Sequence, residues 1–353
     1  MTHTMRAAVY EKPGVITVKD VPVPQITDGE VLIKVAYTGI CGTDWSIYTG
    51  KYSADKLPLI AGHEFSGTIA EVGKDAVGLS VGDRVTADIN MGCGHCFYCR
   101  KGQSLLCSEF RQLGIHIDGT FAEYVKVPWK LVHLIPESMS MLEAAFIEPT
   151  SCVIHSMKAL DIAVGSSIAI LGSGLGSLHA AIAKQRGAAP IIVIGRNKER
   201  LELAKKMGAD NVISTEDYPD PVARVRELTG GRGADYVIES VGTAETYEQA
   251  FDMLRPGGTL AAFGITGDED VMRINPAKLV LSEKKITSSC AGVGEDWTDA
   301  ITLIANKRID PSPLFSKIMP LDKMEEALHL LQNNRNLVKI FISPVEGSEV
   351  VDL

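Results

Sequence analysis

Four cysteines in one short stretch have the residue type and spacing of metal ligands. Cys93, Cys96, Cys99 and Cys107 follow a C-x2-C-x2-C-x7-C pattern in a segment rich in glycine and charge. Two residues between thiolates let the backbone curl so that both sulfurs reach one Zn²⁺, and four sulfurs leave no open coordination position. The pattern therefore predicts a structural zinc, and the alternatives are disulfides or free surface thiols.

A glycine-rich turn later in the chain has the pattern of a dinucleotide-binding site. It reads Gly172-Ser173-Gly174-Leu175-Gly176-Ser177 and lies between an apolar segment and an alanine-rich one. Glycine lets a pyrophosphate approach backbone N–H groups at the start of a helix. The spacing departs from G-x-G-x-x-G: either Ser177 occupies the last position, or Gly176 serves as the third glycine. The expected cofactor contacts are Gly172, Gly174, Leu175 and Gly176.

The segment after the next apolar run bears on which nicotinamide cofactor binds. It reads Ile194-Gly195-Arg196-Asn197-Lys198, without a carboxylate that could accept a hydrogen bond from a ribose 2′-hydroxyl. Gly195 leaves room there, and Arg196 together with Arg200 can pair with a 2′-phosphate. NADP is therefore favoured over NAD; the alternative is that Arg196 is a solvated loop cation.

Two kinds of elements must position these residues. Short β-prone runs bounded by turn residues fill the first part of the chain, for example 31–35 and 68–72, and predict a sheet or barrel. From about Val164, strand-like and helical segments alternate, which predicts a parallel sheet and an α/β fold. The strands of that sheet are expected at 168–171, 191–194, 211–214, 235–239 and 259–263, with helices at 177–186 and 199–207 among them.

The tail returns to mixed structure. Asp322 and Glu325 have the spacing of a capping box that would open a helix at 323–332, and 338–342 resembles a last strand. The chain of 353 residues is about twice a typical domain, so two domains are expected.

The bulk composition excludes several partners. The net charge is −9, and no basic run is interleaved with aromatic residues, so nucleic acid is not an expected partner. The apolar stretches are far shorter than the ~20 residues that span a bilayer, so no membrane segment is expected. Residues Met1 to Arg6 carry no apolar run of the kind that directs secretion. A cytoplasmic protein with reduced cysteines is therefore expected.

Several motifs together resemble the zinc-containing medium-chain dehydrogenase/reductase family over nearly the whole chain. They are Gly39-Ile40-Cys41-Gly42-Thr43-Asp44, Gly62-His63-Glu64, the four-cysteine loop, the glycine-rich turn and Leu254-Arg255-Pro256-Gly257-Gly258. Glu148, followed by proline, is similar to the sorbitol, polyol and threonine dehydrogenase branch. The resemblance implies a GroES-like β-rich catalytic domain at 1–150 and 291–353, and a Rossmann dinucleotide-binding domain at 151–290.

The resemblance also implies an open catalytic zinc site. Cys41, His63 and Glu148 would be its ligands, with Glu64 beside them or as an exchanging fourth ligand. One thiolate, one carboxylate and a neutral imidazole balance Zn²⁺ and leave a position for a substrate oxygen, on which the metal acts as a Lewis acid. Cys152 is a rival third ligand.

Other roles follow from the same resemblance. The Thr43 hydroxyl would take the substrate proton, and Ser46 stands where many relatives have the histidine that passes it on. Further cofactor contacts are expected at Val241, Gly264 and Ile265. Cys290 is expected to be buried and inert, and His95, His116 and His155 to be structural or surface residues. One catalytic and one structural zinc per chain, and a homodimer or homotetramer, are expected.

The implied activity is hydride transfer between NAD(P) and a secondary alcohol or ketone of a small hydroxylated substrate such as a polyol, sugar or cyclitol. Gly292 replaces an arginine that holds the substrate in sorbitol-type enzymes, so a threonine-like amino alcohol or an aminocyclitol is the alternative. A different class is also open, namely a non-catalytic NADP-binding structural or stress protein. Intact Cys41, His63 and Glu148 argue against that class, because a structural role needs no open metal site.

Overall fold

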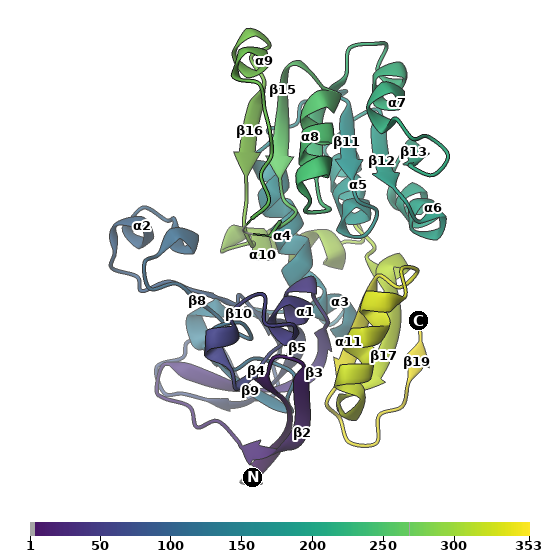
Figure 1. Ribbon diagram of the computed structural model, residues 1–353. Helices are drawn as coiled ribbons and strands as arrows, with labels where there is room; N and C mark the ends of the chain where they lie inside the picture. The colour runs from purple at the N-terminus through teal and green to yellow at the C-terminus, as the bar shows by residue number, and fades with distance from the viewer. Residues whose placement is uncertain (1–3, 268) are drawn as a thin grey trace. The chain divides into compact units, whose positions relative to one another are not determined.

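The computed structural model describes residues 4–267 and 269–353, which form two compact units (Figure 1). The first unit comprises the chain up to Pro149 together with Val293–Asn306 and Phe315–Leu353. The second comprises Thr150–Gly292 and Lys307–Leu314. Helix α4 (Ile147–Lys158) carries the chain from the first unit into the second.

The first unit is built around β-sheets whose central strand is β3 (Glu30–Gly39). The Asp28-Gly29 turn leads into β3, and Val31, Leu32 and Ile33 in it are almost fully buried, as expected for a strand covered on both faces. The order of the largest sheet is β10-β6-β5-β3-β18-β17-β19, with β9 also on β3. Its other strands are β5 (Glu64–Val72), β6 (Arg84–Ala87), β9 (Tyr124–Pro128), β10 (Val132–Leu134), β17 (Phe315–Pro320), β18 (Lys339–Ser343) and β19 (Val351–Asp352).

Smaller elements complete the first unit. A three-stranded sheet pairs β1 (Thr4–Lys12) with β2 (Val15–Pro22) and β4 (Leu59–Ile60), and a ribbon pairs β7 (Asn90–Met91) with β8 (Arg111–Gln112). One apolar core joins β1 to a helix near each end of the unit's chain, through Tyr10, Ile47 and Leu328 among others. The helices are α1 (Gly42–Tyr48), α2 (Phe97–Arg100), α3 (Met141–Ala145), α10 (Glu295–Ala305) and α11 (Met324–Asn333).

The predicted capping box at Asp322 and Glu325 does not form. Residues Leu321–Lys323 make a 3-10 turn, and α11 begins at Met324 without a side-chain cap. Asp322 instead pairs with the Arg6 guanidinium of β1 through both carboxylate oxygens. The prediction was wrong because a cation from a distant strand competes for the carboxylate that a local cap would use.

The second unit is a doubly wound parallel sheet of six strands in the order β13-β12-β11-β14-β15-β16 (Figure 1). The strand order reverses between β11 and β14, so this unit has the topological switch point at which α/β folds bind dinucleotides. The strands are β11 (Ile168–Leu171), β12 (Ile191–Gly195), β13 (Asn211–Ser214), β14 (Ala234–Glu239), β15 (Leu254–Ala262) and β16 (Lys285–Ser288). The helices are α5 (Leu175–Gln185), α6 (Lys198–Met207), α7 (Pro221–Leu228), α8 (Ala244–Met253) and α9 (Pro276–Leu281).

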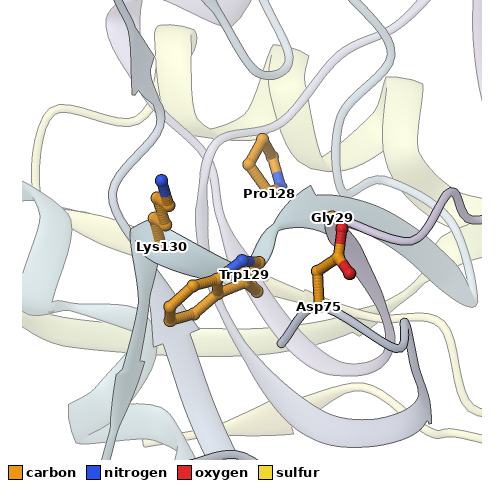
Figure 2. A pocket seen from close by; sticks show the side chains of 5 residues that line it. All are labelled: Gly29, Asp75, Pro128, Trp129 and Lys130. Atoms are coloured by element: carbon orange, nitrogen blue, oxygen red, sulfur yellow. The ribbon is translucent and has the colours of Figure 1, made fainter. Parts of the chain in front are cut away.

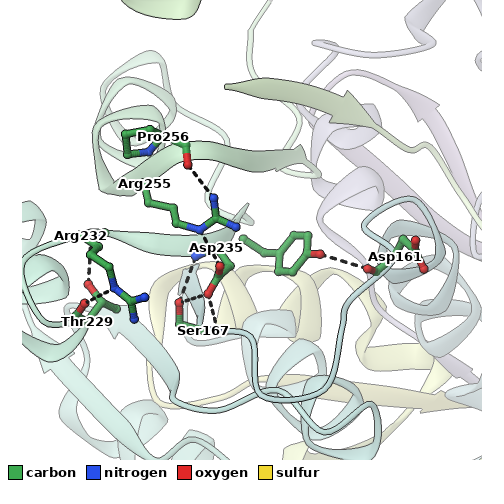
Figure 3. A network of polar contacts seen from close by, with 9 residues as sticks. Asp161, Ser167, Thr229, Arg232, Asp235, Arg255 and Pro256 are labelled. Carbon is green, nitrogen blue, oxygen red and sulfur yellow. Dashed lines mark hydrogen bonds and ion pairs between the residues drawn. The ribbon is translucent and has the colours of Figure 1, made fainter. Parts of the chain in front are cut away.

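A polar network joins three strands at the amino ends of this sheet (Figure 3). The Asp235 carboxylate accepts hydrogen bonds from the Ser167 backbone N–H at 2.8 Å and hydroxyl at 2.6 Å, and from Arg255 Nε at 2.6 Å. The Leu254-Arg255-Pro256 motif therefore has a structural role here, since it ties β15 to the starts of β11 and β14. This lies at the end of the sheet opposite the switch-point loops.

The predicted fold class, a GroES-like β-rich domain with a parallel-sheet Rossmann domain, is confirmed. Strand β16 was not predicted from the sequence, nor were β19 and several other strands of the first unit, such as β2 and β17. Among the described residues, no helix is long and apolar enough to cross a membrane.

Candidate active site

The structure brings the four cysteine thiols of the predicted zinc loop together. Their Sγ atoms all lie within 4.8 Å of one another, between β7 and β8. Backbone N–H groups point at the sulfurs: Cys93 N is 3.2 Å from Cys107 Sγ, and Cys96 N is 3.3 Å from Cys93 Sγ. The backbone N–H of Cys99 is the main cause that lowers the pKa of Cys96 to about 6. Such donors stabilise thiolates, which is the ligand form of cysteine.

A second group combines a thiol, an imidazole and a carboxylate in the first unit. One ligand atom each of Cys41, His63 and Glu64 lies within 4.8 Å of the others. Cys41 precedes α1, His63 directly precedes β5, and Glu64 is the first residue of β5. His63 is 3% exposed and Glu64 is 1% exposed. The Thr43 hydroxyl lies 3.7 Å from Cys41 Sγ.

The negatively charged groups around His63 favour a bound cation. Asp44 is completely buried, accepts from the Cys41 backbone N–H at 2.8 Å, and has Oδ1 3.7 Å from His63 Nδ1. Burial alone would lower the pKa of His63, but Asp44, and after it Cys41 and Glu148, raise it to about 10. A Zn²⁺ ion fits this donor set, because it would balance the surplus negative charge while Asp44 faces Nδ1 and leaves Nε2 to ligate.

Glu148 is buried at the start of α4 and adds to the negative potential at His63. Among the described residues, the carboxylate shown within 4.8 Å of the Cys41 and His63 ligand atoms is that of Glu64. Ligation by Glu148 therefore stays a prediction. Cys152 lies one helical turn further along α4.

Glu64 has a cationic partner that the sequence did not indicate. Lys339 Nζ, from β18, lies 2.5 Å from Glu64 Oε2 and also donates to the Ile40 carbonyl at 3.0 Å. Gly39 lies so close that a Cβ there would collide with the Glu64 carboxylate. Lys339 is 5% exposed, so this pair is held inside the first unit.

Other residues named from the sequence belong to neither the four-cysteine group nor the group of Cys41, His63 and Glu64. The Ser46 hydroxyl donates within α1, to the Gly42 carbonyl at 3.3 Å. The prediction that Cys290 is buried was wrong: it is exposed, because it follows the edge strand β16, which has a neighbouring strand on one side only. His95 is exposed, and one ligand atom each of His95, Cys93 and Glu109 lies within 4.8 Å of the others, at the edge of the four-cysteine group. His116 Nδ1 accepts from the Gln112 backbone N–H at 3.0 Å.

The glycine-rich turn lies at the carboxyl end of β11 and opens α5. Gly172 has φ 107°, and a Cβ there would meet the Ser240 carbonyl oxygen at 3.0 Å, so only glycine fits. Ser177 is buried in the first turn of α5, where its hydroxyl donates to the Ser173 carbonyl at 3.0 Å. A Cβ on Gly176 would lie 3.0 Å from the Ile170 side chain. Gly176 therefore gives the close helix–strand packing that a third glycine usually provides.

Near Gly195, the two candidate arginines, Arg196 and Arg200, lie in different surroundings. A Cβ on Gly195 would lie 2.8 Å from Ser173 Oγ, so Ser173 fills the space that a larger residue would need. Arg200 Nη1 lies 3.7 Å from the position of a Cβ on Gly174, while Arg196 is exposed. Arg200 thus reaches the glycine-rich turn from the first part of α6.

A pocket on the first unit is lined by Gly29, Asp75, Pro128, Trp129 and Lys130 (Figure 2). None of the predicted site residues lines it, so we assign it no part in the chemistry.

Comparison with known proteins agrees with these features. Residues 27–137 match the alcohol dehydrogenase GroES-like domain, and residues 174–306 match the zinc-binding dehydrogenase domain. A sorbitol dehydrogenase from Halalkalibacterium halodurans is 33% identical over 347 residues, covering 97% of this chain and 100% of that protein. An L-threonine 3-dehydrogenase from Pyrococcus horikoshii is 34% identical over 350 residues, covering 97% and 99%.

A solved structure is similar along almost its full length. It is that of a zinc-binding dehydrogenase from Sinorhizobium meliloti bound to NADP, with a TM-score of 0.92 and 32% identity, covering 97% of this chain and 99% of that chain. A cysteine-rich, GroES-like unit and a glycine-rich turn at a parallel-sheet switch point define a zinc-dependent dehydrogenase. The chain belongs to the zinc-containing medium-chain alcohol dehydrogenase family, in the branch that includes sorbitol, polyol and threonine dehydrogenases.

Proposed function

We propose that this enzyme oxidises a secondary alcohol of a small hydroxylated substrate, or reduces the corresponding ketone, with NADP as the cofactor. The observation that carries the proposal is the cluster of the half-buried Cys41 with the buried His63 and Glu64, with Glu148 close enough to raise the pKa of His63. Cys41, His63 and Glu148 would hold the catalytic zinc. When bound, zinc supplies Lewis acidity that stabilises an alkoxide oxygen.

The chain's own residues have complementary tasks in this proposal. Asp44 Oδ1 lies 3.7 Å from His63 Nδ1, and by accepting a hydrogen bond from that nitrogen it would leave the other ring nitrogen to ligate. Lys339 neutralises Glu64, so that Cys41 and Glu148 supply the two negative charges that balance Zn²⁺. Thr43, beside Cys41, would accept the substrate's hydroxyl proton while it passes its own proton on toward solvent. The four-cysteine loop would hold a second, structural zinc.

The choice of NADP rests on the end of β12. No carboxylate is present at position 195 to accept from a ribose 2′-hydroxyl, and Ser173 occupies the space beside it. Arg200, which reaches the glycine-rich turn, is the better candidate for a 2′-phosphate partner. The exposed Arg196 would lie at the edge of the 2′-phosphate site. A charge-assisted contact of this kind is worth roughly 1.5–3 kcal/mol, or about ten- to a hundredfold in affinity.

The test compares Arg200→Gln and Arg196→Gln with Lys206→Gln, which removes an exposed cation from the far end of the same helix. The measurement is kcat/KM with NADP and with NAD, on a panel of polyols, sugar acids and amino alcohols. Arg200→Gln should lower the NADP value about ten- to a hundredfold and leave the NAD value nearly unchanged. A wild type that already prefers NAD would refute the NADP assignment while leaving the dehydrogenase assignment intact.

An amino alcohol substrate is the second candidate, favoured by one packing feature. A Cβ on Gly292 would collide with the Ser151 backbone, so no substrate-holding arginine fits at this position. The substrate panel decides between the two, because activity on threonine-like amino alcohols without activity on sorbitol-like polyols would select the second candidate. A cytoplasmic homodimer or homotetramer is part of the same proposal. A chain with one zinc and no activity on the panel would favour the non-catalytic alternative.

A further inference from the structure

A buried carboxylate links backbone groups at the switch-point end of the second unit. Glu239, the last residue of β14, is completely buried. Its Oε1 accepts from the backbone N–H groups of Val241 and Gly242, both at 2.9 Å, and lies 2.8 Å from the Thr246 hydroxyl. Glu239 therefore holds the loop after β14 and the first turn of α8 at once.

The same residue is tied to the loop after β15. The Glu239 carbonyl accepts from the backbone N–H groups of Phe263 at 3.1 Å and Gly264 at 2.8 Å. The Tyr247 hydroxyl, from α8, donates to the Gly264 carbonyl at 2.5 Å. A Cβ on Gly264 would collide with both Gly242 and the Glu239 carboxylate. The two loops are therefore packed backbone to backbone around one carboxylate.

The strand order places these loops under one half of a bound dinucleotide. Gly195 ends β12 on one side of β11, and β14 and β15 follow on the other side. A cofactor with its pyrophosphate at the Gly172 turn and its 2′-position at Gly195 must extend its nicotinamide half over the ends of β14 and β15. Val241 and Ile265 project there, 46% and 84% exposed, and the Val241 side chain lies 3.3 Å from the position of a Cβ on Gly172.

We propose that Glu239 is a positioning residue that fixes the Val241 and Ile265 loops for the nicotinamide half of the cofactor, through hydrogen bonds shared with Thr246 and Tyr247. The inference rests on the proposed function. A carboxylate suits this place because the groups that face it are donors, and a glutamine would turn an amide N–H₂ toward a backbone N–H. Burial, and after it the Glu239 charge, raise the pKa of Tyr247, which keeps its hydroxyl a donor to Gly264.

The experiment separates the two halves of the cofactor in the zinc-loaded, full-length enzyme. Dissociation constants are measured by fluorescence for NADPH and NADH, and by competition for the fragments 2′,5′-ADP and 5′-AMP. The variants are Glu239→Gln, Tyr247→Phe and Thr246→Val. Glu245→Gln is the matched control, since it makes the same change on the exposed first turn of α8.

Glu239→Gln should weaken binding of the intact cofactor by about ten- to a hundredfold, and binding of the matching fragment by no more than about twofold. Tyr247→Phe and Thr246→Val each remove one hydroxyl. Each should weaken binding of the intact cofactor several-fold and leave binding of the fragment nearly unchanged. These two variants test the inference if Glu239→Gln does not fold. An equal loss for cofactor and fragment, or no loss for either, overturns the inference. A wild type that binds neither NADPH nor NADH rejects the proposed function itself and the inference with it.

Discussion

Glu64 and Lys339 form a buried ion pair between residues 275 positions apart in the chain, with Nζ 2.5 Å from Oε2. Burial alone would lower the pKa of Lys339, but Glu64, and after it Cys41 and Glu148, raise it, so the lysine is charged. The pair joins β18, near the end of the chain, to Glu64 at the start of β5, across β3, which pairs with both strands. A fixed cation thus stands next to the candidate catalytic cluster and compensates one of its carboxylates.

Removal of one partner of this pair should be costly. Lys339→Met leaves the Glu64 carboxylate buried without its cation, and a broken buried pair typically costs about 3–5 kcal/mol. Urea denaturation should show this loss, and the double variant Lys339→Met with Glu64→Gln should recover a large part of it. Lys198→Met, which breaks an exposed pair with Asp217, is the control and should leave the midpoint nearly unchanged. Equal midpoints for Lys339→Met and wild type would contradict the buried pair.

Zinc content distinguishes the two predicted metal sites. Wild type should contain two zinc ions per chain by elemental analysis. Cys99→Ser should contain one and lose thermal stability, because four closed thiolate ligands contribute metal-binding energy to folding. Cys41→Ser should also contain one but keep most of that stability, and Cys290→Ser, at an exposed site, should keep both. Two zinc ions in Cys99→Ser would refute the structural site.

The third ligand of the catalytic zinc can be assigned by paired substitutions on α4. Glu148→Ala should lower kcat at least about a hundredfold, since it removes one of the charges that balance Zn²⁺ and loosens the metal. Binding of NADPH should persist, because the glycine-rich turn belongs to the second unit. Cys152→Ala and the exposed Glu137→Ala should keep near-normal turnover. The opposite result, an inactive Cys152→Ala and an active Glu148→Ala, would transfer the ligand role to the cysteine.

A buried histidine in the second unit should make stability depend on pH. His179 on α5 packs edge-to-face on Phe263, with ring centroids 4.7 Å apart, and burial lowers its pKa to about 4. Between about pH 6.5 and 4 the unfolded chain therefore takes up a proton that the folded chain does not, so stability falls as the pH falls. Each pKa unit is worth about 1.4 kcal/mol, so this histidine alone should cost about 3 kcal/mol by pH 4.

The check is the free energy of unfolding from pH 7 to 4. His179→Leu should flatten the profile, while His95→Gln, a change at an exposed imidazole, should leave it unchanged. A wild-type profile that stays level over this range would show that His179 is not shielded from water.

The sequence alone was sufficient for the fold class and for the features that depend on local spacing. The four cysteines and the glycine-rich turn each lie within about fifteen residues, so the chain between their members limits where those members can go. Alternating strand and helix patterns likewise predicted a parallel sheet, because each pattern is set by side chains that are close in sequence.

Tertiary structure decided the contacts between distant segments. Lys339 appeared to be only one residue of a last strand, and its place beside Glu64 depends on the pairing of β18 with β3. Glu239 ended a predicted strand, and the hydrogen bonds from Phe263 and Gly264 to its carbonyl depend on the pairing of β14 with β15. Asp322 pairs with the distant Arg6 and does not cap the nearby helix. In each case the partner is brought near by packing, and for the buried Glu64 and Lys339 a charge without such a partner would be too costly to persist. Local sequence patterns do not indicate which distant strand will supply that partner.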